Sequence, residues 1–133
     1  MRILVVDDEA EIRSIVKDHL VKANYEVVEA EDGEEAIRKI NEGDNPLEVS
    51  AVICDLRMPK INGIEAISYF QKEYPNLPLI VITGFPDTQL AVDLLKKGVK
   101  DYLVKPVEKD RLLAAVKKVV SERRYGATGV KPI

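Results

Sequence analysis

Residues 3–9 read Ile-Leu-Val-Val-Asp-Asp-Glu, a run of four apolar residues followed directly by three acids. A short, unbroken apolar run rich in β-branched residues is typical of a strand that is buried on both faces, and hence of a parallel sheet. Similar runs occur at residues 25–30, 51–54, 79–82 and 102–104. The sequence therefore predicts five strands, most of them buried on both faces, and the first leads straight into a cluster of carboxylates.

Amphipathic segments lie between and after these strands. Apolar residues recur at helical spacing within residues 12–20, 36–40, 64–74, 90–95 and 112–120, which predicts five helices. Asp32 with Glu35 three residues later forms a capping-box pattern, and Asp87 and Gly98 are a candidate helix start and end. The alternating order predicts an α/β fold with a doubly wound five-stranded parallel sheet. We expect the polar residues 41–50 to form a surface loop.

The composition is that of one small soluble domain. The chain has 133 residues, of which 46% are hydrophobic and 32% charged, with a net charge of −3. This acidic balance argues against direct contact with nucleic acid, which requires a basic face. The single cysteine excludes an intrachain disulfide, and the apolar run at residues 3–6 is too short for a signal peptide or a membrane span. We expect a cytoplasmic domain over residues 1–120 without membrane contact, followed by a tail or linker over residues 121–133.

Chemically useful side chains stand at the ends of four predicted strands. Asp7 and Asp8 follow the first strand, Asp55 the third, Thr83 the fourth and Lys105 the fifth. In the flavodoxin-like strand order 2-1-3-4-5, the first and third strands are neighbours, and ligands bind outside the carboxyl ends of the strands. We therefore expect these five side chains to share one pocket.

The chemistry of this set favours phosphoryl transfer. Three close carboxylates attract a divalent cation, and Mg²⁺ prefers carboxylate oxygens together with a phosphate oxygen. Asp55 is a candidate nucleophile toward phosphorus, which would give an aspartyl phosphate. Thr83 and Lys105 offer a hydroxyl and a positive charge to the phosphoryl oxygens.

Four motifs in this order resemble the receiver domain of two-component response regulators. They are ILVVDDE at 3–9, ICDLRMPKINGIE at 53–65, VITG at 81–84 and YLVKP at 102–106, and the resemblance extends from residue 2 to about residue 120. It implies a phosphoacceptor domain that takes a phosphoryl group from a histidine kinase or a phosphotransfer protein with Mg²⁺. It also implies a signalling module and not an enzyme with multiple turnovers.

The resemblance assigns roles around the phosphoacceptor. Asp55 would accept the phosphoryl group, Asp8 would bind Mg²⁺ directly, and Asp7 would hold the water shell of the metal. The backbone carbonyl of Arg57 would complete the protein ligands. Lys105 would contact Asp55 at rest and a phosphoryl oxygen afterwards.

Further positions match the switching parts of the family. Thr83 corresponds to the switch hydroxyl, Tyr102 to the switch aromatic, and Pro106 to a proline that is usually preceded by a cis bond. Met58-Pro59 and Gly63 match the loop after the phosphoacceptor. The surface formed by residues 90–95, 102–104 and 112–120 would then control an output partner, an attached effector or a homodimer.

Two residues suggest a long lifetime for the phosphoryl group. Arg57 lies two residues after Asp55, and Phe85 lies two residues after Thr83, so both are expected to border the approach of water. Phe85 offers no hydrogen bond that would orient a water molecule. Gly84 stands where the family more often has alanine, which loosens the loop that carries Phe85.

Three other functions fit the sequence less well than the receiver. A small phosphatase with an aspartate nucleophile requires Asp-x-Asp after the first strand, whereas this chain has Asp7 followed by Asp8. A nucleotide-binding module requires a glycine-rich phosphate loop after that strand, and none is present. A flavodoxin-like cofactor binder would have a first loop rich in hydroxyl groups and glycine. The output is not encoded in these motifs, although residues 81–106 loosely resemble receivers that precede ATPase or DNA-binding effectors.

Overall fold

The five predicted strands form one parallel sheet. The computed structural model describes residues 1–57 and 62–128. The sheet has the order β2-β1-β3-β4-β5, which confirms the predicted fold class and strand order. The strands are β1 (Arg2–Val6), β2 (Glu26–Ala30), β3 (Val49–Asp55), β4 (Leu79–Thr83) and β5 (Asp101–Val104).

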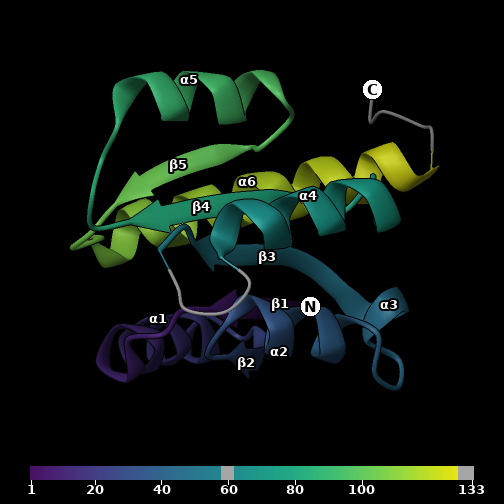
Figure 1. Ribbon diagram of the computed structural model, residues 1–133. Coiled ribbons are helices and arrows are strands. Elements are labelled where there is room, and N and C mark those ends of the chain that lie inside the picture. The colour runs from purple at the N-terminus through teal and green to yellow at the C-terminus, as the bar shows by residue number, and fades with distance from the viewer. Residues whose placement is uncertain (58–61, 129–133) are drawn as a thin grey trace.

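Helices cover both faces of this sheet (Figure 1). They are α1 (Ala10–Lys22), α2 (Gly33–Ile40), α3 (Asn45–Glu48), α4 (Gly63–Glu73), α5 (Thr88–Lys96) and α6 (Lys109–Thr128). Helices α1 and α6 share one hydrophobic core with the sheet, and α2, α4 and α5 share the other.

The two cores explain the unbroken apolar runs. In β1, Ile3 and Val5 pack in the core with α1 and α6, while Leu4 and Val6 pack in the core with α2, α4 and α5. Successive side chains of a strand point to opposite faces, so every position of β1 that reaches a core must be apolar. The same double burial applies to β3 and β4, which lie inside the sheet with their last residues at its carboxyl edge.

The five predicted helices are all present, and the described residues contain one further short helix, α3. Helix α3 occupies part of the segment that was predicted to be a polar loop. It buries no residue, so it has no apolar periodicity for a pattern to detect. Polar contacts hold it instead: the Arg2 guanidinium lies 2.7 Å from Asp44 Oδ1 and 2.9 Å from Asn45 Oδ1.

The helix starts follow the predicted caps. The Asp32 carboxylate accepts a hydrogen bond from the Glu35 N–H at 2.7 Å, and the Asp87 carboxylate accepts one from the Leu90 N–H at 3.0 Å. Helix α6 continues to Thr128 and so includes part of the segment predicted to be a tail or linker. Within the described residues, no helix is both long enough and apolar enough to cross a membrane.

Candidate functional site

The carboxyl edge of the sheet brings the predicted site residues together. Asp55 and Thr83 end β3 and β4, Asp7 follows β1, and Lys105 follows β5. Asp7, Asp55 and Thr83 are buried, with 2%, 3% and 1% of their surface exposed, whereas Asp8 is exposed. Because β1 and β3 are adjacent, the two buried aspartates meet at the point where the sheet changes its winding direction.

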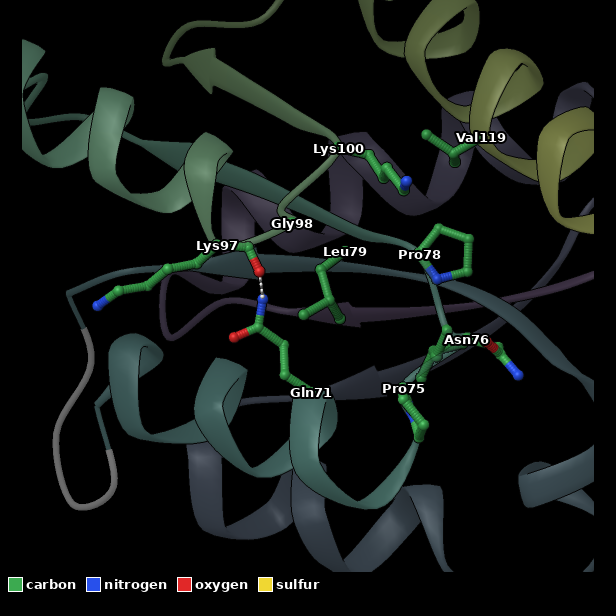
Figure 2. Close-up of a pocket in the computed structure, with 10 residues that line it drawn as sticks. Gln71, Pro75, Asn76, Pro78, Leu79, Lys97, Gly98, Lys100 and Val119 are labelled. Carbon is green, nitrogen blue, oxygen red and sulfur yellow. Dashed lines mark hydrogen bonds between the residues drawn. The ribbon is translucent and has the colours of Figure 1, made fainter.

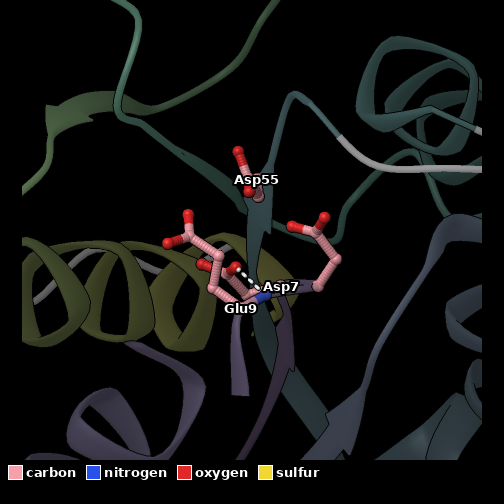
Figure 3. Close-up of side chains that lie close together, drawn as sticks. Asp7, Glu9 and Asp55 are labelled. Atoms are coloured by element: carbon pink, nitrogen blue, oxygen red, sulfur yellow. Dashed lines mark hydrogen bonds between the residues drawn. The ribbon is translucent and has the colours of Figure 1, made fainter. Parts of the chain in front are cut away.

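Four carboxylates gather at this edge. Each of Asp7, Asp8, Glu9 and Asp55 offers one oxygen, and these oxygens all lie within 4.8 Å of one another. Figure 3 shows Asp7 and Glu9 from the loop after β1 beside Asp55 at the end of β3. The Glu9 N–H also donates a hydrogen bond to Asp7 Oδ1 at 2.9 Å, which fixes the Asp7 side chain.

The ammonium group of Lys105 lies among these carboxylates. Its Nζ is 2.9 Å from Asp7 Oδ2, 2.9 Å from Glu9 Oε1 and 3.1 Å from Asp55 Oδ2. Burial alone would lower the pKa of Lys105, but the hydrogen bonds to Glu9 and Asp7 outweigh it and hold this pKa above its usual value. Lys105 therefore remains charged and neutralises part of the cluster. The contact with Glu9 was missed in the sequence, although Glu9 is the third acid of the run after β1.

Burial dominates the electrostatics of Asp55. It raises the pKa of this carboxyl, while the Arg57 N–H, 3.2 Å from Oδ1, and Lys105 act in the opposite direction. The folded protein thus keeps a poorly solvated carboxylate at the end of a rigid strand, with a cation in contact. A poorly solvated carboxylate in contact with a cation is suited to act as a nucleophile.

Gly63 closes the loop after Asp55. A Cβ atom at this position would lie 2.1 Å from the Asp55 carbonyl oxygen and 2.5 Å from the Leu56 Cα, so only glycine fits. The Gly63 N–H donates to the Leu56 carbonyl at 3.1 Å, which anchors the start of α4 against the end of β3. Met58 and Pro59, which the sequence also placed in this loop, lie outside the described residues.

The two predicted switch residues are engaged in separate contacts. Thr83 Oγ1 accepts a hydrogen bond from the Phe85 N–H at 3.1 Å. Tyr102 is half-buried against the core that contains α2, α4 and α5, and its hydroxyl accepts a hydrogen bond from the Asp87 N–H at 3.3 Å. Next to them, the peptide bond between Lys105 and Pro106 is cis.

An open cavity of about 280 Å³ lies over the carboxylates. It is lined by Asp8, Glu9, Asp55, Arg57, Gly84, Phe85 and Lys105. At its border, the Arg57 guanidinium carbon lies 4.0 Å from the centroid of the Phe85 ring, a cation–π contact. The two residues that were expected to border the approach of water therefore touch each other.

The donor set fits a small, hard divalent cation. The site offers carboxylate oxygens from Asp7, Asp8 and Asp55, which are the ligand type that Mg²⁺ prefers. Asp7 Oδ2 is buried, and apart from its ion pair with Lys105 it accepts no hydrogen bond within the described part of the chain. A buried carboxylate oxygen that is short of donors is a suitable partner for a metal or for one of its bound waters.

A second cavity, of about 360 Å³, lies at the opposite end of the sheet (Figure 2). It is lined by residues before β4, at the end of α5 and on α6, and the Gln71 side-chain amide donates to the Lys97 carbonyl beside it at 2.9 Å. None of the predicted site residues lines this cavity. The predicted site residues therefore lie away from this cavity, at the carboxyl edge.

Comparison with known proteins agrees with this geometry. The family model described as the response regulator receiver domain matches residues 3–117. The chain belongs to this receiver family, whose members are signalling modules.

Individual relatives include both short and long proteins. The chain is 40% identical over 119 residues to a chemotaxis protein CheY from Thermotoga maritima, with 89% of this chain and 96% of the relative covered. It is 32% identical to the transcriptional regulatory protein ZraR from Klebsiella oxytoca, of which only 28% is covered, against 96% of this chain. A receiver domain crystal structure from Clostridium thermocellum matches with a TM-score of 0.86 at 32% identity, covering 92% of this chain and 96% of that one.

Proposed function

We propose that this receiver accepts a phosphoryl group on Asp55 from the phosphohistidine of a histidine kinase or a phosphotransfer protein. The observation that carries the proposal is the buried Asp55 carboxylate, which faces an open cavity and contacts Lys105 at 3.1 Å. In the transfer, a carboxylate oxygen attacks phosphorus, a P–O bond forms and the P–N bond breaks. The imidazole nitrogen leaves with the electron pair of that bond.

The surrounding residues position and neutralise the group. Mg²⁺, held by Asp8, Asp55, the Arg57 carbonyl and the water shell on Asp7, would offset the charge of the phosphoryl oxygens. Lys105 already lies within hydrogen-bond distance of Asp55, so a small shift brings its ammonium to a phosphoryl oxygen. Phosphoryl transfer depends mainly on such positioning and charge stabilisation.

Phosphorylation would act by shifting a pre-existing equilibrium. The Thr83 hydroxyl would move toward the phosphoryl group and donate a hydrogen bond to one of its oxygens, and Tyr102 would follow into the space that Thr83 leaves. The surface of α5, β5 and α6 would then change its affinity for an output partner, an attached effector or a second copy of the chain. A complete shift from 1:99 to 99:1 requires about 5.5 kcal/mol of differential interaction.

Labelling with a small phosphodonor tests this function. Wild type and Asp55→Asn are incubated with acetyl phosphate and Mg²⁺, and intact-mass spectrometry counts the phosphoryl groups. We expect one group on wild type and none on Asp55→Asn. A wild-type chain that takes up no phosphoryl group would refute the proposal. Repeated hydrolysis of a phosphatase substrate would instead favour the small-phosphatase alternative.

A further inference from the structure

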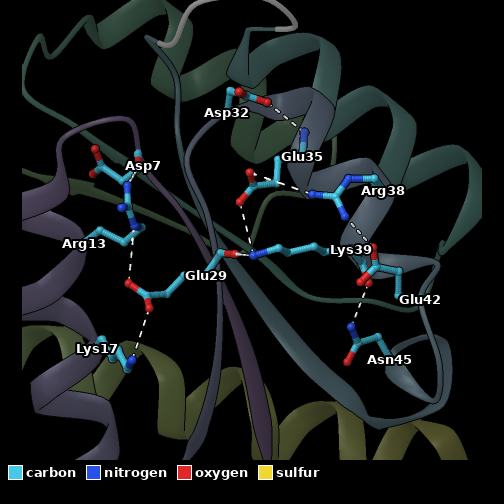
Figure 4. A network of polar contacts seen from close by, with 10 residues as sticks. All are labelled: Asp7, Arg13, Lys17, Glu29, Asp32, Glu35, Arg38, Lys39, Glu42 and Asn45. Carbon is cyan, nitrogen blue, oxygen red and sulfur yellow. Dashed lines mark hydrogen bonds and ion pairs between the residues drawn. The ribbon is translucent and has the colours of Figure 1, made fainter.

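Arg13 lies directly behind the acidic loop. It stands on the second turn of α1, and its side chain is 18% exposed. Its Nη1 donates a hydrogen bond of 2.7 Å to the backbone carbonyl of Asp7, and its Nε lies 3.3 Å from Glu29 Oε1 on β2. Figure 4 shows this guanidinium between the end of β1 and the side chain of Glu29. Arg13 therefore links Asp7, which follows β1 and begins the acidic cluster, to Glu29 on β2.

The backbone of Asp7 is held on both sides of its Cα. Its N–H donates to the Ala30 carbonyl at 3.1 Å, and its carbonyl accepts from Arg13. Residues 7–9 join β1 to α1. The Asp7 carbonyl lies in the same planar peptide unit as the Asp8 N–H, so its orientation also sets the direction of the backbone at Asp8. A substitution at Arg13 would thus reorient the backbone that carries the Asp7 and Asp8 carboxylates.

The charge of Arg13 is paired with Glu29 on β2. Glu29 pairs with the guanidinium, and Glu29 also contacts Lys17 Nζ at 3.1 Å. The backbone carbonyl of Glu29 accepts a hydrogen bond from Lys39. Glu29 therefore holds Arg13 in place and offsets its charge, so Arg13 orients the loop without competing with a cation for the carboxylates of Asp7 and Asp8.

We infer that Arg13 is a positioning residue for the metal site: through the Asp7 carbonyl it fixes the loop that presents Asp7 and Asp8 to Mg²⁺. The inference rests on the proposed function, because it requires that the carboxylates bind Mg²⁺. Groups that orient metal ligands from the second sphere commonly change metal affinity by about 10- to 100-fold when they are removed. We take the lower end, because the hydrogen bond from the Asp7 N–H to the Ala30 carbonyl still holds the preceding peptide in these variants.

Isothermal titration with Mg²⁺ in the absence of a phosphodonor measures this effect. We expect Arg13→Gln to weaken the affinity by about 10-fold. Arg13→Lys should recover part of the loss, because an ammonium can still donate to the Asp7 carbonyl. Lys17→Gln is the matched control: it removes the other cation on Glu29 without altering the Asp7 carbonyl, and its affinity should stay within about two-fold of wild type. Urea unfolding of each variant reports the stability separately.

The outcomes separate the inference from the proposed function. Equal Mg²⁺ affinity in wild type and Arg13→Gln would overturn the inference, and so would an equal loss in Lys17→Gln. If Arg13→Gln does not fold, Arg13→Met replaces it, because methionine keeps most of the aliphatic stem and removes every donor to the Asp7 carbonyl; an unchanged affinity there would overturn the inference. A wild-type chain that binds no Mg²⁺ would instead refute the metal site itself, and the inference with it.

Discussion

Replacing Phe85 with leucine tests whether its contact with Arg57 protects the phosphoryl group on Asp55. The Arg57 guanidinium lies 4.0 Å from the ring centroid, at the border of the cavity above Asp55. Leucine keeps an apolar side chain but removes the aromatic face that attracts the cation. We expect the two side chains to separate more often in this variant, which opens a path for water toward phosphorus.

The exposure of Phe85 sets the size of the effect. The residue is 61% exposed, and a cation–π contact at such a site is worth about 0.5–1 kcal/mol. Losing it raises the population of the open arrangement by about 2- to 5-fold at 25 °C. If water enters only through that arrangement, the first-order rate of dephosphorylation rises by the same factor.

The assay follows the decay of phosphorylated protein in Mg²⁺ after the phosphodonor has been removed. Phe85→Trp keeps a stronger aromatic face and should decay no faster than wild type. Phe85→Glu should decay faster than Phe85→Leu, because its carboxylate can orient a water molecule. Leu47→Ala, at an exposed position on α3, is the control and should leave the rate unchanged. Decay of Phe85→Leu at or below the wild-type rate would refute the reasoning.

Three further predictions concern stability. Burial raises the pKa of Asp55, so the folded protein favours the protonated carboxyl over the carboxylate. The stability that this group contributes is present below the unfolded-state pKa of about 3.9 and is lost as the pH rises through the folded-state pKa. Asp55→Asn should therefore be more stable than wild type at pH 7 in urea unfolding, and its advantage should vanish near pH 3; a less stable variant at pH 7 would contradict this. Gly63→Ala should cost about 3 kcal/mol or more, because its Cβ would meet the Asp55 backbone, and a change under 1 kcal/mol in the same assay would show that the loop yields. Burial would raise the pKa of Asp101, but the two hydrogen bonds from Arg111 outweigh burial and lower this pKa. The pair therefore stabilises the fold above the unfolded-state pKa of about 4, and this stabilisation is lost as the pH falls through the folded-state pKa. Asp101→Asn should cost less than about 1 kcal/mol at pH 7, since Arg111 is half exposed, and an equal cost at pH 2 would disprove the charge argument.

Elements that bury side chains were predictable from the sequence. The strands β1, β3 and β4 lie between two cores, and their apolar runs identified them directly. Helix α3 buries nothing and is held by polar contacts from Arg2, so no apolar pattern marked it. Helix α6 passes Val120 without the apolar periodicity that predicted its first part, because residues with a high intrinsic helix preference, such as Glu-Arg-Arg at 122–124, need no apolar pattern to be helical.

The site was predictable where it depends on the backbone alone. Strand ends place Asp7, Asp55 and Thr83 at one edge, and a parallel sheet requires this of any side chain in these positions. The contacts of Glu9 with Lys105 and of Arg13 with the Asp7 carbonyl depend on how far long side chains reach across the fold. Charged residues near the start of a helix are common on protein surfaces. The sequence therefore did not mark Glu9 or Arg13 as part of the site.

The hydrogen bond from the Phe85 N–H to Thr83 Oγ1 has a consequence for timing. If the Thr83 side chain moves to donate to a phosphoryl oxygen, its Oγ1 moves relative to this N–H, and the backbone at Phe85 also carries the ring that faces Arg57. The rearrangement that starts the signal would then loosen the barrier that determines how long the signal lasts. Onset and duration would share one three-residue segment, so a substitution there would alter both together.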